Sequence, residues 1–142
     1  MIRTIVYISN SVKLIEENTL NKLFLQTMLN NTLKNITGVL IYKEGTFIQI
    51  LEGKAPALNN LFKKIQTDVR HNNITKILDR MNAKRLFGKF HTVLSSRGNA
   101  RQLVNLETFL TDRADSSHSN TLLGLLHPFL NKSNNSMNAL SC

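Results

Sequence analysis

Two apolar runs separated by Glu44-Gly45 constrain the fold of this chain more than any other stretch. The first extends from Ile36 to Lys43 and the second from Thr46 to Gly53, and both are rich in β-branched residues. A glycine in a two-residue connection supplies the positive φ that tight turns require, so the stretch predicts a β-hairpin. Apolar residues occupy both parities of each run, which predicts central strands that are covered on both faces.

One polar side chain, Gln49, interrupts the second run and shares a strand face with Phe47 and Leu51. Burying its amide without partners would cost about 1–3 kcal/mol. In one interpretation Gln49 bonds to neighbouring backbone or lies at the edge of the sheet. In the other it belongs to a polar site inside the fold. Gln49 taken alone favours the first interpretation.

The N-terminal half contains one further strand and one helix. Alternation from Ile2 to Ser9 predicts a strand. Asn18 or Thr19 is the expected N-cap of the helix, and Asn31 is a candidate for its C-cap. The apolar stripe of this helix consists of Leu20, Leu23, Phe24, Thr27 and Met28.

After the hairpin, Pro56 suits the first turn of a second helix. Asn72-Asn73 predicts a turn before a fourth strand from Ile74 to Met81, and a fifth strand is expected up to Leu94. The predicted fold class is therefore α+β: a ferredoxin-like βαββαββ sandwich with two helices on one face of a mixed five-stranded sheet.

Two C-terminal helices are expected to follow this sandwich, one from about Ala100 to Leu110 and one from Leu122 to Leu130, which Pro128 limits. A polar linker is predicted from Thr111 to Ser119. The large apolar residues of the last helix predict burial on the second face of the sheet or in a subunit interface. The expected division is a domain at 1–96, a helical extension at 97–131 and a disordered Asn/Ser-rich tail at 132–142.

Composition bounds the function class. Cys142 is the only cysteine, which excludes an internal disulfide and fits a reducing, cytoplasmic compartment. No window approaches the length of a membrane span. The formal net charge of +9 suits nucleic acid, an acidic partner or a phosphorylated ligand. The Lys and Arg residues are scattered along the chain, however, which argues against a dedicated nucleic-acid stripe.

Ordinary catalytic and metal-binding motifs are absent from the sequence. The four histidines lack metal-site spacing, and the glycines form no phosphate loop. We therefore expect neither a metal site nor an enzyme. What remains is a set of polar groups that the pattern aims inward, and such a set makes a slot for a flat, hydrogen-bonding heterocycle. The set consists of Tyr7, Ser9, Asn30, Asn31 and Gln49.

From Met1 to Ser96 the chain resembles a BLUF domain, a blue-light sensor that binds flavin between two helices on a mixed sheet. The resemblance depends on several motifs in the right order and spacing. They are Tyr7-Ile8-Ser9, Asn30-Asn31 before Ile36-Thr37-Gly38, Phe47-Ile48-Gln49-Ile50-Leu51-Glu52-Gly53, and Ile65 through Asp68 to Arg70-His71.

The resemblance implies FAD as a non-covalent cofactor and leaves open whether FMN or riboflavin can replace it. It implies that Tyr7 donates an electron and a proton to the photoexcited flavin, and that Gln49 lies between Tyr7 and the flavin N5/O4 edge. Asn31 would bond the O4/N3 edge with Asn30 beside the ring, and Lys64 would lie near the ribityl-phosphate arm. The other cofactor-binding residues implied are Ser9, Ile65, Asp68 and His71.

Two departures concern signal output. Phe90 stands where the family often has Trp, and Thr92 where it has Met, in a region that passes the signal to the surface. The chain ends soon after the domain, so no attached cyclase, phosphodiesterase or DNA-binding domain is expected. The implied arrangement is a homo-oligomer that signals to a separate downstream protein.

Two alternatives remain at this stage. One is a basic ferredoxin-like module that binds RNA or an acidic protein without flavin. Against it, the exposed strand positions lack aromatics arranged as a stacking platform. The other is a relic that keeps the fold and has lost its light output. No membrane association is expected in any of these cases.

Overall fold

The hairpin predicted around Glu44-Gly45 is present in the computed structural model. Strands β2 (Thr37–Lys43) and β3 (Thr46–Gly53) pair antiparallel, with Glu44 at φ 50° and Gly45 at φ 85° in the turn. Two successive positive φ values match the right-handed twist of the flanking strands. The structure describes residues 1–88, 91–95, 100–113 and 116–130, and for 91–95 the side chains lie outside this description.

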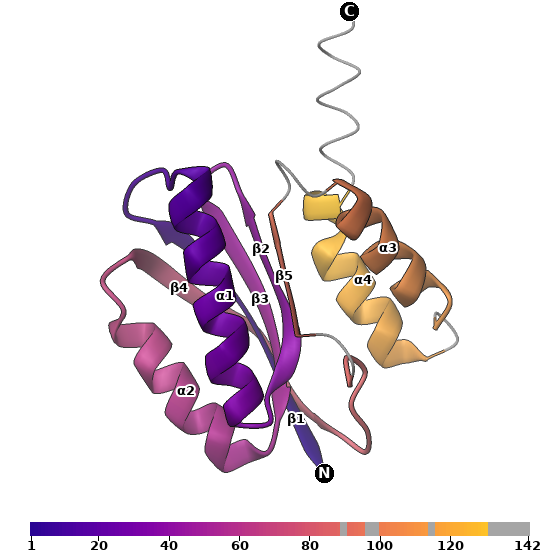
Figure 1. Ribbon diagram of the computed structural model, residues 1–142. Coiled ribbons are helices and arrows are strands. Elements are labelled where there is room, and N and C mark those ends of the chain that lie inside the picture. The colour runs from indigo at the N-terminus through magenta and orange to yellow at the C-terminus, as the bar shows by residue number, and fades with distance from the viewer. Residues whose placement is uncertain (89–90, 96–99, 114–115, 131–142) are drawn as a thin grey trace, which may run out of the picture. The chain divides into compact units, whose positions relative to one another are not determined.

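The hairpin lies inside a five-stranded sheet of order β4-β1-β3-β2-β5 (Figure 1). Strand β1 spans Ile2–Ser11, β4 spans His71–Asn82 and β5 spans His91–Ser95. The pairs β1–β3, β1–β4 and β2–β3 are antiparallel. Strands β1 and β3 are thus flanked on both sides, and the α+β ferredoxin-like fold is confirmed. The sheet is mixed only if β5 runs parallel to its neighbour β2. The mixed character of the sheet therefore stays a prediction.

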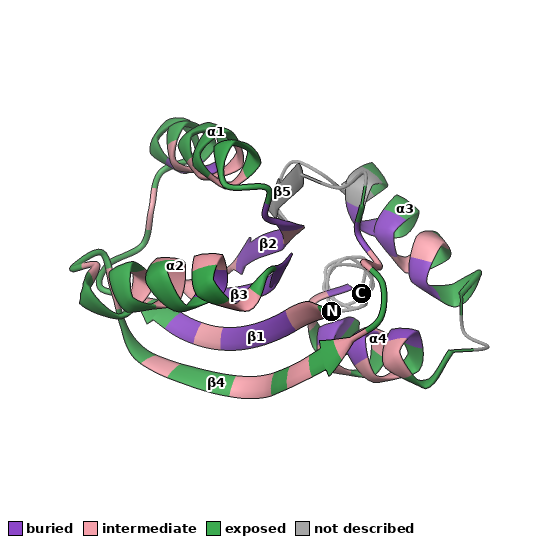
Figure 2. Cartoon of the chain, turned by 90° about the horizontal axis from the view of Figure 1, so that it is seen from below, coloured by how far each residue is buried: buried purple, intermediate pink, exposed green. Residues whose placement is uncertain are grey.

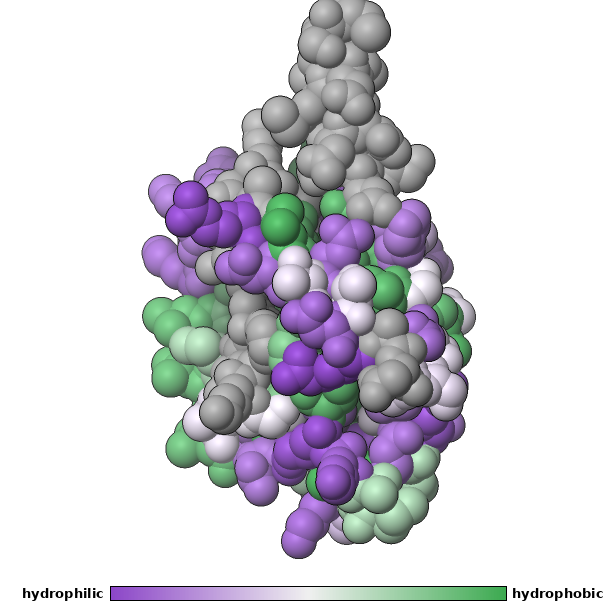
Figure 3. Space-filling view, turned by 90° about the vertical axis from the view of Figure 1, so that its right-hand side faces the viewer, coloured by the Kyte–Doolittle hydropathy of each residue, from purple (hydrophilic) through white to green (hydrophobic). Residues whose placement is uncertain are grey.

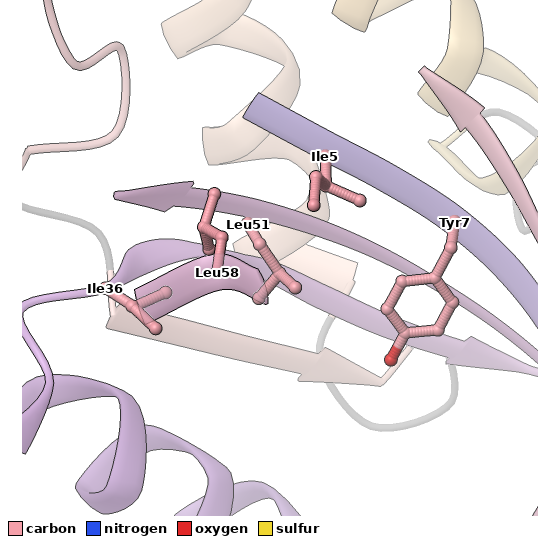
Figure 4. Close-up of a cluster of buried hydrophobic side chains, with 5 residues drawn as sticks. All are labelled: Ile5, Tyr7, Ile36, Leu51 and Leu58. Carbon is pink, nitrogen blue, oxygen red and sulfur yellow. The ribbon is translucent and has the colours of Figure 1, made fainter. Parts of the chain in front are cut away.

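Helices α1 (Glu17–Leu33) and α2 (Ala55–Thr67) lie on one face of this sheet (Figures 1 and 2). Each helix packs on its own buried cluster. The cluster under α2, drawn in Figure 4, consists of Ile5, Tyr7, Ile36, Leu51 and Leu58. The cluster under α1 consists of Leu20, Phe24, Leu40, Tyr42 and Phe47.

Both predicted ends of the first helix are wrong. Helix α1 begins at Glu17, after Glu16 in an extended conformation, so Asn18 and Thr19 lie in its first turn. The C-cap is Lys34, which leaves Asn31 within the last turn of the helix. Cap signals are local and weak, so they locate the end of a helix only to within one or two residues.

The predicted turn at Asn72-Asn73 lies within β4. Asn72 pairs with Asn10 of β1, and the pairing continues to His71. A register shift in the β1–β4 ladder and the positive φ of Asn73, 53°, accommodate the irregularity without ending the strand. An asparagine tolerates this conformation better than most residues, so it marks a bulge here as readily as a turn.

Glu52 of β3 points to the sheet face opposite Gln49 and is fully buried. Its carboxylate accepts hydrogen bonds of 2.7 Å each from the backbone N–H groups of Leu86 and Phe87. Burial raises the pKa of Glu52, and these backbone donors work in the opposite direction. Arg85 donates to the Thr37 hydroxyl at 2.9 Å and to the Asn35 carbonyl at 2.7 Å. The chain that follows β4 is therefore fastened to β2 and β3.

The chain divides into two compact units, Met1–Val93 and Leu94–Cys142. In the second unit, helices α3 (Ala100–Thr111) and α4 (Ser117–Leu130) pack against each other. Six leucines of the two helices are buried, while Leu123 and Phe129 are half-buried. The buried leucines are Leu103, Leu106, Leu110, Leu122, Leu126 and Leu130.

The last helix begins earlier than the sequence predicts. Ser117 is already helical, and the Ser116 hydroxyl accepts a hydrogen bond of 2.9 Å from the Ser119 N–H, which caps the first turn. Pro128 lies inside the helix and does not end it. The tail predicted to be disordered at 132–142 lies outside the described residues. Within the described ranges, no helix has both the length and the apolar character needed to cross a membrane.

The approach of β2 to β3 at Gly38 yields a first test. An alanine Cβ there would lie 1.8 Å from the Ile50 carbonyl oxygen, at a φ of +148°. Gly38→Ala must therefore push two central strands apart, and we expect it to lower the free energy of unfolding by about 2 kcal/mol or more. Urea denaturation followed by far-UV circular dichroism measures the change.

Gly124→Ala in α4 is the matched control, since nothing lies within 4 Å of an added Cβ. There the substitution should stabilise the helix by roughly 0.5–1 kcal/mol. An unchanged urea midpoint for Gly38→Ala would show that the hairpin does not need the close contact.

Candidate functional site

Tyr7 and Gln49 face each other across the two central strands. They are direct cross-strand partners in the β1–β3 register, and only 4% of Tyr7 and 5% of Gln49 is exposed. The Tyr7 hydroxyl donates a hydrogen bond to Oε1 of Gln49. Because β3 lies between β1 and β2, the edge-strand interpretation of Gln49 is wrong. Its partner is a buried phenol.

The surroundings of Tyr7 hold its proton in place. Burial raises the pKa of the phenol well above its usual range, and the negative charge of Asp68 raises it further. A low-dielectric environment disfavours the phenolate, so Tyr7 stays a hydrogen-bond donor across the physiological range. In this arrangement the proton of the phenol lies on the hydrogen bond to Gln49.

A cavity of about 230 Å³ opens beside this pair and is lined by residues of α1, α2 and the sheet. Its walls combine aliphatic and aromatic side chains with amides, a phenol, an imidazole and charged groups. The lining residues are Tyr7, Leu23, Thr27, Asn30, Asn31, Lys34, Leu40, Phe47, Gln49, Leu61, Lys64, Ile65, Asp68, Arg70 and His71. Such a mixture suits a flat ligand with a polar edge.

Most of the residues singled out in the sequence meet at this cavity. Eight of the nine residues expected to be photoactive or to bind the flavin line it: Tyr7, Asn30, Asn31, Gln49, Lys64, Ile65, Asp68 and His71. Ser9 is buried on β1 and contacts His71 instead. Of the two expected transmission residues, Phe90 lies outside the described residues, and for Thr92 only the position in β5 is described.

His71 is held at both ring nitrogens. Nε2 lies 2.7 Å from the Ile65 carbonyl oxygen, and Nδ1 lies 2.8 Å from the Ser9 hydroxyl. A carbonyl can only accept, so Nε2 carries the hydrogen, and in the neutral ring Ser9 donates to Nδ1. Ser9 thus fixes the orientation of His71, whose ring packs edge-on against Tyr7 with centroids 6.3 Å apart.

Sequence reasoning missed two cations of the cavity, Lys34 and Arg70. The Arg70 guanidinium donates to the Asp68 carboxylate, with Nε 2.9 Å from Oδ1, and holds the pKa of that carboxyl below its usual value. Arg70 belongs to one of the motifs on which the family resemblance depends, but the sequence indicated no role for it. Lys34 follows the first helix, and nothing in its local sequence indicates that it reaches a residue of the second.

Comparison with known proteins agrees with this architecture. Residues 2–92 match the family of BLUF domains, described as sensors of blue-light using FAD. The match covers more than half of the chain, and the chain belongs to the BLUF family. The family match therefore favours a flavin-based light sensor over the basic RNA-binding or acidic-protein-binding module.

Among characterised relatives, the photoactivated adenylate cyclase subunit beta of Euglena longa is 34% identical over 74 residues, which cover 52% of this chain and 9% of that protein. Subunit alpha of the enzyme from Euglena gracilis is 32% identical over 85 residues, covering 60% and 8%. The chain thus matches less than a tenth of these relatives.

Two solved structures extend the likeness. BlrP1 of Klebsiella pneumoniae, solved with FMN and cyclic diGMP, is 27% identical with a TM-score of 0.74, covering 92% of this chain and 34% of that one. BlrB, a BLUF protein in its dark state, has a TM-score of 0.67 at 23% identity, covering 92% and 96%. The BlrB likeness shows the fold alone.

The raised pKa of Tyr7 predicts how stability depends on alkaline pH. Above a pH of about 10, tyrosine ionises in the unfolded chain while the buried Tyr7 keeps its proton. The unfolded state then binds fewer protons, so the free energy of unfolding should fall by up to about 1.4 kcal/mol per pH unit. Tyr7→Phe should lack this contribution. Urea midpoints of both proteins at pH 9 to 11 measure it, and parallel pH profiles would contradict a protonated, buried Tyr7.

Proposed function

We propose that this chain is a blue-light photoreceptor domain whose flavin binds in the cavity between α1 and α2, with Tyr7 and Gln49 as the photoactive pair. The observation that carries the proposal is the buried phenol–amide hydrogen bond at the cavity wall. A phenol and an amide that are buried on central strands both need hydrogen-bond partners, and here each is the partner of the other.

The donor set fits a flavin. An isoalloxazine ring has apolar faces and a polar edge, and the cavity offers apolar walls such as Leu40 and Ile65 with amides from Asn31 and Gln49. Asn30 presents its NH₂ group as the remaining donor, because Gln26 donates to its Oδ1 at 3.0 Å. We assign Asn30, Asn31 and Gln49 to the polar edge. We assign Ile65, Asp68 and His71 to the surroundings of the ring. Lys64 is assigned to the phosphate arm, and Ser9 acts through His71.

When bound, the flavin supplies a blue-light-driven acceptor for an electron and a proton. The protein supplies the rest. Tyr7 holds the phenolic proton in the dark, and its bond to Oε1 of Gln49 offers that proton a path. While Oε1 accepts from Tyr7, the NH₂ end of Gln49 is the group left for the cavity. A rearrangement of the amide exchanges donor for acceptor at the cavity wall, which an aliphatic residue could not do.

We further propose that the domain acts as a sensor on a downstream signalling protein, as a cytoplasmic homo-oligomer, and carries no catalytic turnover itself. Support comes from relatives whose names join a photoactivated module to an adenylate cyclase. On the face drawn in Figure 3, hydrophilic side chains are interspersed with apolar ones. Phe90 and Thr92 remain the proposed transmission positions.

Difference spectroscopy tests the photoactive pair. The purified protein should release a flavin on denaturation, and blue light should shift the flavin absorption slightly to the red, with recovery in the dark. Tyr7→Phe and Gln49→Leu should bind flavin and lose the shift, because one lacks the hydroxyl and the other the amide. Tyr42→Phe is the matched control: Tyr42 is also buried, but its hydroxyl accepts from the Ile15 N–H at 3.2 Å, and it does not line the cavity.

A normal reversible shift in Tyr7→Phe would refute the role assigned to Tyr7. Absence of any released flavin, even after reconstitution with FAD, would refute the proposed function as a whole.

A further inference from the structure

Two lysines from different helices meet at the cavity. Lys34 is the C-cap residue of α1, and Lys64 stands in the last turn of α2. Both line the cavity beside the Tyr7–Gln49 pair, and α1 and α2 lie next to each other over the sheet (Figure 1). Thirty residues apart in the sequence, the two side chains are brought together by the packing of both helices on one face.

Both lysines carry a positive charge. The pKa of the Lys34 ammonium is lowered, first by burial and then by the nearby ammonium of Lys64. Two like charges on the wall of one cavity repel each other, and an anion bound between them would remove that repulsion. The protein does not supply that anion. Asp68 is the only acidic residue among the lining side chains, and Arg70 holds it.

The remaining ion pairs in the described ranges join Asp79 to Arg3 and to Lys76, so neither lysine of the cavity takes part in one. A lysine near a helix C-terminus usually stabilises the helix dipole. That accounts for each residue separately. It does not account for both lysines lining the same cavity.

We propose that Lys34 and Lys64 together form a phosphate clamp, which makes this chain select phosphorylated flavins over riboflavin. The inference rests on the proposed flavin site and adds a specificity-determining residue, Lys34, to it. The ring pocket is common to riboflavin, FMN and FAD, whereas only the last two carry phosphate. A phosphate group placed between two ammonium groups accepts a charge-assisted hydrogen bond from each and removes their repulsion.

The test compares the three flavins on the full chain after its flavin has been removed. Isothermal titration calorimetry gives the dissociation constants of riboflavin, FMN and FAD for the wild type, Lys34→Gln, Lys34→Arg and Lys63→Gln. Lys63 is the matched control, because it is the neighbour of Lys64 on α2 and is exposed, as Lys34 and Lys64 are, but does not line this cavity. Lys34→Arg keeps the charge.

The wild type should bind FMN and FAD more tightly than riboflavin, and raising NaCl from low to high concentration should shrink the difference. Lys34→Gln should weaken the binding of FMN and FAD by roughly three- to tenfold, as expected for one exposed charged contact, and leave the binding of riboflavin unchanged. Lys34→Arg should restore most of the preference. Lys63→Gln should behave as wild type.

Equal affinity of the wild type for the three flavins would overturn the clamp and leave the flavin site intact. An equal loss for riboflavin and FMN in Lys34→Gln would also overturn it, because the lysine would then support the ring pocket or the fold. Failure of the wild type to bind any of the three flavins would overturn the proposed function, and the clamp with it.

Discussion

The hydrogen bond between Tyr7 and Gln49 depends on one register between β1 and β3. A shift of a single residue would turn Gln49 to the opposite face of the sheet and leave both polar groups buried without partners. The neighbouring pairs hold that register, since Ile5 lies opposite Leu51 and Val6 opposite Ile50, all fully buried. The apolar ladder of the central strands therefore fixes the geometry of the polar pair.

The cavity exists because the two helices pack on separate clusters. Leu58 of α2 belongs to the cluster with Ile5 and Leu51, and Phe24 of α1 to the one with Leu40 and Phe47. The cavity beside them is lined by amides, a phenol, an imidazole and charged groups together with apolar side chains such as Leu40 and Ile65. The same layout that stabilises each helix on the sheet leaves room for a ligand between them.

Strand β3 connects the cavity with the opposite face of the sheet. Gln49 faces the helices, while Glu52, three residues later, faces the other way and binds the backbone of Leu86 and Phe87. Odd and even positions of a strand point to opposite faces, so Gln49 and Glu52 lie on opposite faces of the sheet although they are only three residues apart. The segment fastened by Glu52 and Arg85 precedes β5, the strand that holds Thr92. A rigid central strand thus contacts both the proposed photoactive pair and the chain leading to the proposed output.

Periodicity and turn chemistry were enough to predict the hairpin, the order of the elements and the ferredoxin-like class, because alternation and a Glu44-Gly45 turn are local properties. The family motifs also indicated eight of the residues that line the cavity. The sequence could not determine that α1 extends to Leu33 or that β4 includes Asn72, because pairing and packing override weak caps and turn signals. Nor could it place Lys34 beside Lys64, Ser9 behind His71, or Glu52 against Leu86. Contacts between residues 30 or more apart depend on how the helices and strands pack, and only the tertiary structure decides that.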